Sequence, residues 1–325
     1  MEQEISSRLS RRGRFVNAHL ENPRRTIWDA ILWKLGRYKD LTPLPLKPSE
    51  FCYPAVAKPF NRTNDWAVWI GHSSYLVDFE GCKFLTDPVW GKYCSPIPIQ
   101  ALKRLAAPPF PLTALPKLSS VLISHNNYDH LDEKTVCRIA MEQPNISWIV
   151  PQRLKPWFEK RKIGPCYELS WWSSVQLGPH RITAVPTQHF SGRTLWDQNK
   201  TCWNGYIVES LATSRKFYFV GDTGYNPLDF KAIGARFAPV DLSLIPIGTY
   251  APRRFMSTVH SSPEDAVEIH LDVRSKLSLG MHWKTFRLSE ESLDRPPYDL
   301  YLAMQKKNLD FDTFLPIDIG TYINW

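Results

Sequence analysis

Short apolar runs separated by turn residues make up most of the chain from residue 65 onward. Three of them follow one another at Trp66–Ile70, Ser74–Phe79 and Cys82–Thr86, and Glu80-Gly81 supplies the turn between the last two. Runs of this length predict strands, and their short connections predict antiparallel pairing. Eight further strands are predicted at Ser120–Ser124, Ile146–Val150, Ser174–Leu177, His180–Pro186, Asn204–Glu209, Lys216–Val220, Asp241–Pro246 and Lys276–Met281.

Between these strands, apolar residues at helical spacing predict helices. One runs from Asp132 to about Met141, one lies near Arg153–Lys162, one follows Ser262 over Pro263–Leu271, and one over Glu290–Lys307 is interrupted at a proline pair. Ser is a favoured N-cap and Pro a favoured first helical residue. Strands mixed with helices, without strict alternation, predict an α/β layered fold with helices on the sheet faces.

The first 60 residues have a different pattern from the rest. We predict a basic arm, an amphipathic helix at Thr26–Tyr38 and a proline-rich connector at Leu41–Pro59, followed by a single domain over residues 61–325. Trp28 and Trp33 would suit a helix that lies on a membrane surface. A helix packed on the domain core explains the same apolar face equally well.

Charge is concentrated in this arm. Between Arg8 and Lys39, nine Lys or Arg stand against Glu21 and Asp29, a net +7, while the whole chain carries +8. Such a segment favours a polyanionic partner, either an anionic membrane surface or nucleic acid. A solvated arm without a partner is the alternative, and no further RNA-binding motif is present.

Composition excludes several classes of protein. The chain has 325 residues, 43% hydrophobic and 22% charged, which is an ordinary globular balance. The charged start has no apolar segment of a secretory signal, and no apolar run approaches the length of a membrane span. Six scattered cysteines without a CxxC pair indicate reduced thiols. We therefore expect a cytoplasmic protein that is not secreted; a homodimer remains open.

Candidate metal ligands follow four of the predicted strands. The segment 124–132, Ser-His-Asn-Asn-Tyr-Asp-His-Leu-Asp, comes after the first of them, and His189, Asp222 and His282 follow the others. Because the ends of neighbouring strands converge, these side chains can form one site. His and Asp without Cys suit Zn²⁺, Fe or Mn in a hydrolytic centre.

Four further residues could contribute to this site or have another role. Asp132 could orient a ligand histidine or simply cap the following helix. His72 is more consistent with a structural or outer role, because it precedes a strand. Arg253 and Arg254 could meet a phosphate or lie on the surface.

These motifs closely resemble those of metallo-β-lactamase-fold hydrolases, and among them the N-acyl-phosphatidylethanolamine-hydrolysing phospholipase D family. The resemblance runs in order from about residue 14 to the C-terminus. It is carried by Arg14-Phe15-Val16-Asn17, Trp69-Ile70-Gly71-His72-Ser73, Phe84-Leu85-Thr86-Asp87-Pro88, Ser124–Asp132, Pro186-Thr187-Gln188-His189, Gly221-Asp222-Thr223-Gly224-Tyr225, the segment 246–253, the segment 263–267 and His282-Trp283.

The resemblance implies a four-layer αββα fold with two zinc positions. The first would be held by His125, residue 127, His189 and bridging Asp222. The second would be held by Asp129, His130, Asp222 and His282. Asp129 and Asp222 would be the catalytic carboxylates around an activated hydroxide, and Tyr128 and His260 would face the lipid headgroup.

One ligand departs from the family pattern, because Asn127 stands where the family has a second histidine. An amide oxygen is a weaker Zn²⁺ ligand than imidazole. We therefore expect one firm and one labile zinc position.

The resulting expectation is a zinc-dependent, membrane-associated phosphodiesterase. It would hydrolyse N-acyl phosphatidylethanolamine to N-acylethanolamine and phosphatidate, with no nucleic acid as partner. The alternatives are another hydrolase of this fold, such as a lactonase or a different phosphodiesterase, and a metal-poor lipid-binding scaffold. Deletion of residues 1–25 should weaken binding to lipid vesicles and leave activity on detergent-solubilised lipid largely intact.

Overall fold

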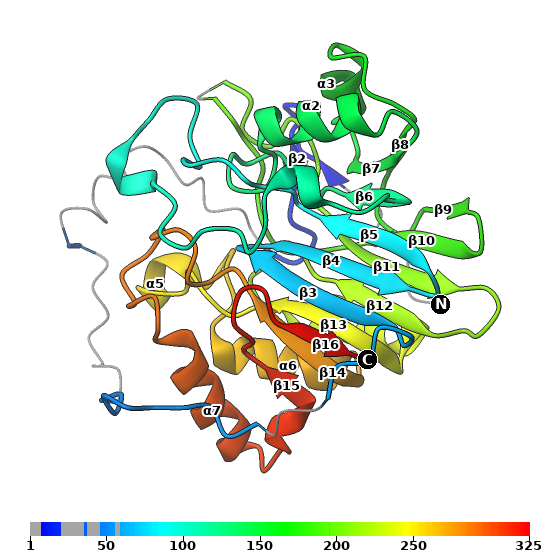
Figure 1. The fold of residues 1–325 in the computed structure, drawn as a ribbon. Coiled ribbons are helices and arrows are strands. Elements are labelled where there is room, and N and C mark those ends of the chain that lie inside the picture. The colour runs from blue at the N-terminus through cyan, green and yellow to red at the C-terminus, as the bar shows by residue number, and fades with distance from the viewer. Residues whose placement is uncertain (1–7, 21–35, 38–45, 56–58, 195) are drawn as a thin grey trace.

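Two seven-stranded sheets face each other in the computed structural model, and helices cover both outer faces (Figure 1). The structure describes residues 8–20, 36–37, 46–55, 59–194 and 196–325. Helices α2 (Glu133–Glu142) and α3 (Lys155–Glu159) lie on one side, and α6 (Pro263–Asp272) and α7 (Pro296–Lys306) lie on the other. The predicted four-layer αββα fold is confirmed.

The first sheet carries the strands of the N-terminal half. Its order is β16 (Tyr322–Asn324), β3 (Trp66–Gly71), β4 (Ser74–Phe79), β5 (Cys82–Thr86), β6 (Ser120–Leu122), β7 (Ser147–Pro151) and β8 (Cys166–Leu169). Strands β3 to β5 pair antiparallel as predicted, and β5 to β8 pair parallel. Glu80 and Gly81 connect β4 to β5 with φ of 50° and 79°, both positive as a type I′ turn requires.

The second sheet carries the strands of the C-terminal half. Its order is β15 (Phe314–Leu315), β14 (Ser275–Met281), β13 (Val240–Pro246), β12 (Lys216–Phe219), β11 (Gly205–Ser210), β10 (His180–Val185) and β9 (Ser174–Leu177). Strands β12 to β15 run parallel, and β10 to β12 alternate in direction. Strands β10, β12 and β14 therefore end at the same edge of the sheet.

Buried aromatic side chains join the two sheets near this edge. Tyr75 donates a hydrogen bond to the carbonyl of Gly280 at 2.8 Å, and Tyr206 donates to that of Ile123 at 2.9 Å. Both tyrosines are fully buried. Each acceptor lies two residues before a predicted metal ligand, His282 and His125 respectively, so the core itself fixes where those ligands emerge.

The helices begin where local chemistry favours it. Ser262 and Asp265 form a capping box at α6, as the Ser-Pro start predicted. Helix α7 starts at the proline pair that was expected to interrupt it, because proline suits the first helical turn and disrupts the interior. Helix α4 (Pro227–Phe237) was not predicted. It packs closely on α6, since a Cβ at Gly234 would lie 2.0 Å from the carbonyl oxygen of Asp272.

The remaining elements are short. They are helix α5 (Arg253–Met256), the 3₁₀ turns η1 (Gln100–Leu102), η2 (Leu112–Ala114) and η3 (Phe311–Thr313), and the strand pair β1 (Arg8–Leu9) and β2 (Phe15–Val16). All six cysteines lie in the described residues and none forms a disulfide. Within those residues, no helix combines the length and apolarity needed to cross a membrane.

The N-terminal 60 residues are described only in part. The predicted helix at Thr26–Tyr38 lies almost wholly outside the described residues, and the division at residue 60 stays a prediction. Phe15 is buried with Trp171, Cys202 and Trp203 of the main domain. In the connector, the Phe51 ring packs edge-on against Tyr298 of α7.

Candidate metal centre

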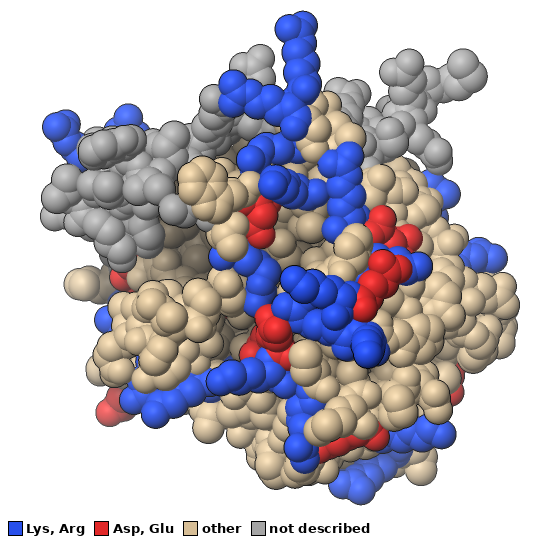
Figure 2. Space-filling view, turned by 90° about the horizontal axis from the view of Figure 1, so that it is seen from above, with Lys and Arg blue, Asp and Glu red and all other residues tan. Residues whose placement is uncertain are grey.

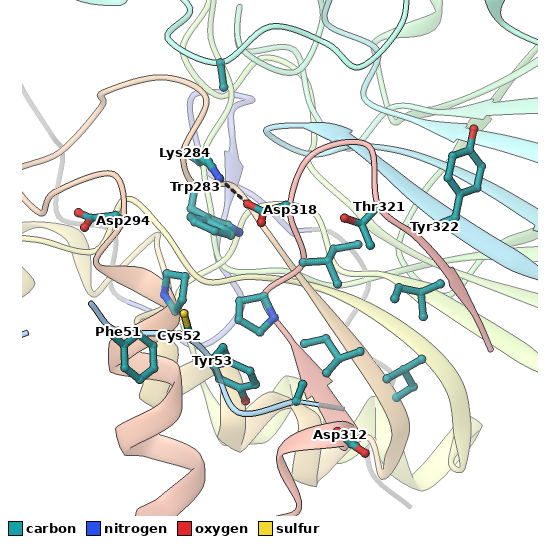
Figure 3. A pocket seen from close by; sticks show the side chains of 18 of the residues that line it. Phe51, Cys52, Tyr53, Trp283, Lys284, Asp294, Asp312, Asp318, Thr321 and Tyr322 are labelled. Atoms are coloured by element: carbon teal, nitrogen blue, oxygen red, sulfur yellow. Dashed lines mark hydrogen bonds and ion pairs between the residues drawn. The ribbon is translucent and has the colours of Figure 1, made fainter. Parts of the chain in front are cut away.

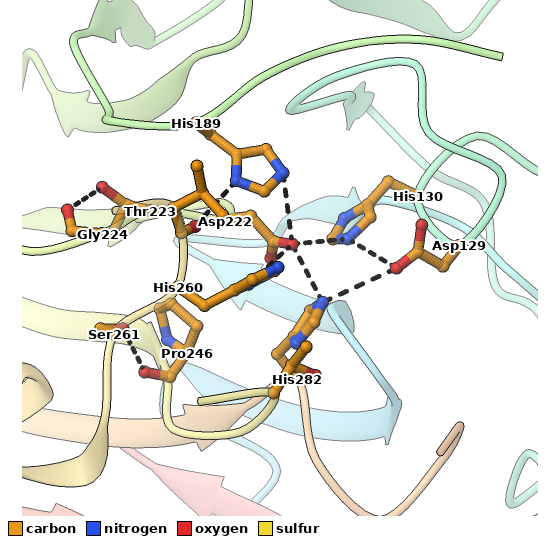
Figure 4. A network of polar contacts seen from close by, with 12 residues as sticks. Asp129, His130, His189, Asp222, Thr223, Gly224, Pro246, His260, Ser261 and His282 are labelled. Carbon is orange, nitrogen blue, oxygen red and sulfur yellow. Dashed lines mark hydrogen bonds and ion pairs between the residues drawn. The ribbon is translucent and has the colours of Figure 1, made fainter. Parts of the chain in front are cut away.

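The residues predicted as ligands lie in four different strand connections and converge in space. His125 follows β6, His189 follows β10, Asp222 follows β12 and His282 follows β14. His130 and Asp129 come from the turn after His125. All four histidines and Asp222 are at least 97% buried. The shared sheet edge therefore turns distant sequence positions into one polar cluster (Figure 4).

Asp222 is the centre of this cluster. Its Oδ2 lies 3.0 Å from Nε2 of His282, 3.2 Å from Nε2 of His130 and 3.7 Å from Nε2 of His189. Its other oxygen, Oδ1, is buried and makes no hydrogen bond among the described residues. One carboxylate thus lies close to imidazoles that follow three different strands. A carboxylate that is shared by two metal ions needs such a position, because it must lie next to the histidine ligands of both ions.

Asp129 forms the second acidic point of the cluster, on the side of His130 and His282. Its Oδ2 lies 3.0 Å from Nε2 of His72, 3.4 Å from Nε2 of His130 and 3.7 Å from Nε2 of His282. His72 was placed away from the ligands because it precedes a strand. That argument was wrong, because the tight β3–β4 connection lies at the same edge and brings the fully buried His72 ring to 4.1 Å from that of His282.

Asp87 orients His130, a role that sequence analysis offered to Asp132. Asp87 Oδ2 lies 2.6 Å from Nδ1 of His130, and Oδ1 accepts the Ser124 backbone N–H at 2.7 Å. Asp132 instead accepts from the Gly91 N–H at 2.9 Å and from the Thr135 hydroxyl, and its side chain makes no capping hydrogen bond to α2. The only sequence signal for Asp87 was its place in the Thr-Asp-Pro motif directly after β5.

Two further histidines, His189 and His125, also have a partner at Nδ1. His189 donates from Nδ1 to the carbonyl of Val259 at 2.8 Å. Its Nε2 therefore carries the lone pair that could bind a metal ion. Nδ1 of His125 lies 2.8 Å from Oγ of Ser124, which also contacts Asp87. Ligand histidines in metal proteins are oriented through their second nitrogen in this way.

Proton affinities in the cluster divide into two groups. Burial lowers the pKa of His125 well below its ordinary value, that of His189 to about 4 and that of His72 to about 3. Burial acts in the same direction on His130 and His282, but the charges and hydrogen bonds of Asp222 and Asp129 together outweigh it. They raise the pKa of His130 well above normal and that of His282 to about 9. A metal ion must displace those protons, so its affinity rises with pH.

The donor set fits a divalent transition metal. Nε2 of His125 and of His189 is buried and makes no hydrogen bond within the described residues, and Nε2 of His130 and of His282 lies against the carboxylates of Asp222 and Asp129. Ligand atoms come within 4.8 Å of one another in several groups, among them His125, His189 and Asp222, and also His72, Asp129, His130 and His282. Burying so many unsatisfied polar atoms is costly unless an ion binds them.

The Asn127 side chain contacts the loop that follows His189. Its Oδ1 accepts the Gly192 backbone N–H at 3.0 Å, and Asn126 Oδ1 accepts the same N–H at 2.7 Å. The Asn127 carbonyl accepts from the N–H groups of His130 and Leu131, closing the turn. The amide therefore links the ligand turn to the loop after His189.

The two residues expected at the headgroup border the cluster from different elements. His260 Nδ1 lies 3.8 Å from Asp222 Oδ2, and its side chain is 11% exposed. Tyr128 lies in the ligand turn, with the Arg193 guanidinium 3.9 Å from its ring centroid. Arg253 donates to the His260 carbonyl at 3.0 Å and pairs with Asp265, so it holds His260 in place.

A cavity of about 1110 Å³ is lined in part by Trp283 and Lys284, the two residues that follow His282 in sequence (Figure 3). Its walls are Phe51, Cys52 and Tyr53 of the connector, the C-terminal segment around Asp318, and Trp283 and Lys284. No predicted metal ligand lines it. Lys284 at its rim pairs with Asp318.

Comparison with known proteins agrees with this geometry. A model described as "Beta-lactamase superfamily domain" matches residues 83–283. The N-acyl-phosphatidylethanolamine-hydrolyzing phospholipase D 1 of Caenorhabditis elegans is 39% identical over 78% of this chain and 74% of its own length. The mitochondrial enzyme of that name from Saccharomyces cerevisiae is 32% identical over 73% of this chain, but the match spans only 51% of the yeast protein.

Among solved structures, a possible metal-dependent hydrolase from Veillonella parvula superimposes with a TM-score of 0.63 at 14% identity. The match covers 81% of this chain and all of that one. At this identity the likeness concerns the fold alone.

Proposed function

The chain belongs to the β-lactamase superfamily and, within it, to the family of N-acyl-phosphatidylethanolamine-hydrolysing phospholipases D, and from this we propose that it is a zinc-dependent phosphodiesterase of that specificity. It is a metal-dependent hydrolase of the metallo-β-lactamase fold. The proposed reaction is hydrolysis of N-acyl phosphatidylethanolamine to N-acylethanolamine and phosphatidate.

The observation that carries the proposal is the position of Asp222. Its Oδ2 lies between His189 on one side and His130 and His282 on the other, at 3.0 to 3.7 Å from each Nε2. Cleavage of a phosphodiester needs positive charge beside the phosphoryl oxygens and a nucleophile at neutral pH. A bound Zn²⁺ supplies both, since it acts as a Lewis acid and lowers the pKa of its water to about 7.

We propose two positions for such ions. We assign the first to His125, Asn127, His189 and Asp222, and the second to Asp129, His130, Asp222 and His282. The second is better supported, because Asp87 holds His130 through Nδ1 and His72 contacts Asp129. His260 and Tyr128 border the cluster and are assigned to the headgroup, where Arg253 and Arg193 hold them.

A direct assay tests the proposed reaction. Purified chain should release N-acylethanolamine from N-acyl phosphatidylethanolamine vesicles, lose the activity on chelation and regain it with Zn²⁺. In H₂¹⁸O the label should enter phosphatidate and not N-acylethanolamine, because the nucleophile attacks phosphorus. Opening of a lactone substrate without lipid turnover would instead support another hydrolase of this fold. Absence of both activities in zinc-loaded protein would support the scaffold alternative.

We also propose an anionic membrane surface as partner. Lys and Arg cover much of the face over α2 and α3, interspersed with Asp and Glu (Figure 2). Arg11 and Arg12 of the arm are exposed. Trp196 is 77% exposed, and its carbonyl accepts from Arg14 at 3.2 Å, so an aromatic ring lies beside the basic segment. Tryptophan next to basic residues is typical of an interfacial contact.

Vesicle sedimentation tests this partner. Binding should rise with the fraction of anionic lipid and fall between 0.01 and 0.15 M salt, as the screening length shortens from about 30 to about 8 Å. Trp196→Ser should weaken binding severalfold. Leu228→Ser, at a residue of α4 that is 61% exposed, is the matched control and should not. Equal binding to neutral and anionic vesicles would contradict the electrostatic contribution.

A further inference from the structure

The segment Arg14–Asn17 contacts the metal centre, although none of its residues is a ligand. Asn17 makes two hydrogen bonds to the main chain of His189. Its Nδ2 donates to the His189 carbonyl at 3.0 Å, and its Oδ1 accepts the His189 N–H at 3.0 Å. Asn17 is 7% exposed. One side chain therefore satisfies both backbone groups of a candidate ligand, as a neighbouring strand would.

Packing and hydrogen bonds fix the position of this segment. Phe15 is 2% exposed, and its ring packs with Trp171 and Trp203. The Phe15 N–H donates to the carbonyl of Asn199 at 2.8 Å. Arg14 donates to the carbonyls of Gln198 and Trp196. The Asn17 amide is thus anchored to the domain and is not carried by a loose arm.

The loop after His189 also contacts the turn that carries the other ligands. Asn199 exchanges hydrogen bonds with Ser191, through its backbone N–H at 2.8 Å and through Oδ1 at 3.1 Å. The next residue, Gly192, donates to Asn126 and Asn127 of the ligand turn. Residues 189–192 are therefore held between the N-terminal segment and the turn that carries His125.

We propose that Asn17 is a positioning residue for His189, so that the N-terminal segment forms part of the first metal position. This inference rests on the proposed metal-dependent function. The Nδ1 bond of His189 to Val259 fixes the ring. The Asn17 pair fixes the backbone that carries the ring, and together they direct Nε2 toward Asp222 Oδ2.

The proposal changes the role expected for the arm. A deletion of residues 1–25 would remove Asn17 from His189 and Phe15 from its packing with Trp171 and Trp203. The structure therefore argues against the expectation that this deletion spares activity on detergent-solubilised lipid. The arm is a structural element of the centre as well as a charged segment.

Zinc affinity of the full-length chain tests the proposal without any lipid assay. Apoprotein is titrated with Zn²⁺ against a competing chelator for wild type, Asn17→Ala, Asn17→Gln and the control Val16→Ala, whose residue lies in the same segment. Asn17→Ala should weaken the first position by at least about 10-fold, the usual effect of losing a partner behind a ligand. The second position should stay within about twofold, and Asn17→Gln should fall between.

Two further measurements separate a loss of positioning from a loss of stability. All variants are also made in the Asn127→His background, where an imidazole keeps the first position measurable, and the thermal midpoint of each apoprotein is recorded. Selective weakening of the first position, with a midpoint no lower than that of Val16→Ala, supports the proposal. Unchanged constants overturn it, as does equal weakening of both positions. If Asn17→Ala does not fold, Asn17→Gln carries the comparison. Absence of lipid turnover with selective weakening would reject the substrate and keep the inference.

Discussion

Asp222→Asn is expected to lower N-acyl phosphatidylethanolamine hydrolysis by at least about 10³-fold, which corresponds to roughly 4 kcal/mol of transition-state stabilisation. The substitution keeps the shape of the side chain but removes its charge. Among the residues that the structure describes, Asp222 is the one carboxylate that approaches His130, His189 and His282 together. Both proposed metal positions lose a ligand at once, so no intact centre remains.

A matched control separates this effect from a general loss of acidity or stability. Asp78→Asn changes an aspartate of β4 that pairs with Lys83 outside the cluster, and it should leave turnover within about twofold, as a surface ion pair contributes little. Bound metal is measured in parallel and should fall only in Asp222→Asn. Retained activity in Asp222→Asn would show that the cluster is not the catalytic centre.

The strands could be predicted because their apolar runs are short and sharply bounded. Strands β4, β5 and β9 have the predicted bounds, since a buried strand and its turn residues leave a local signal. Helix α4 and strand β8 gave no such signal. The sequence Pro227–Phe237 contains Gly234, which is unfavourable in a helix but is required where α4 meets α6. Helix α4 therefore depends on its packing against α6 more than on a local sequence signal.

The site shows the same division between local and long-range information. The ligands His125, Asp129 and His130 could be picked together because they share one turn. Asp87 lies 43 residues before His130 in sequence but 2.6 Å from it in space. Asp132 was the nearer candidate in sequence, and the register of β5 beside β6 placed Asp87 there instead. Strand pairing, which cannot be read from sequence spacing, determines that Asp87 and not Asp132 contacts His130.

Asn127 is where sequence and structure together sharpen the question of metal number. From the sequence alone, Asn127 is expected to be a weak ligand. The structure adds that its Oδ1 accepts from Gly192, and that Asn126 accepts from the same N–H. Two side chains, Asn126 and Asn127, therefore connect the ligand turn to the loop after His189. Replacing Asn127 should leave that loop in place through Asn126, so a substitution there tests ligand chemistry more than folding.

Asn127→His is accordingly expected to convert about one tightly held zinc per chain into about two, because imidazole is a better Zn²⁺ donor than an amide oxygen. Turnover should rise roughly tenfold or more, a part of the several kcal/mol that a metal ion can supply to a phosphoryl transition state. Metal content after mild chelation and initial rates measure both effects. Asn127→Ala is the matched control, since it removes the amide without adding a donor and should gain neither zinc nor rate.

His282→Ala should abolish turnover in either background by opening the second position. More zinc with unchanged or lower turnover would mean that one ion suffices for the chemistry, or that the pocket needs the amide. Two tightly held ions already in the wild type would show that Asn127, or a neighbour such as His260, completes the first position.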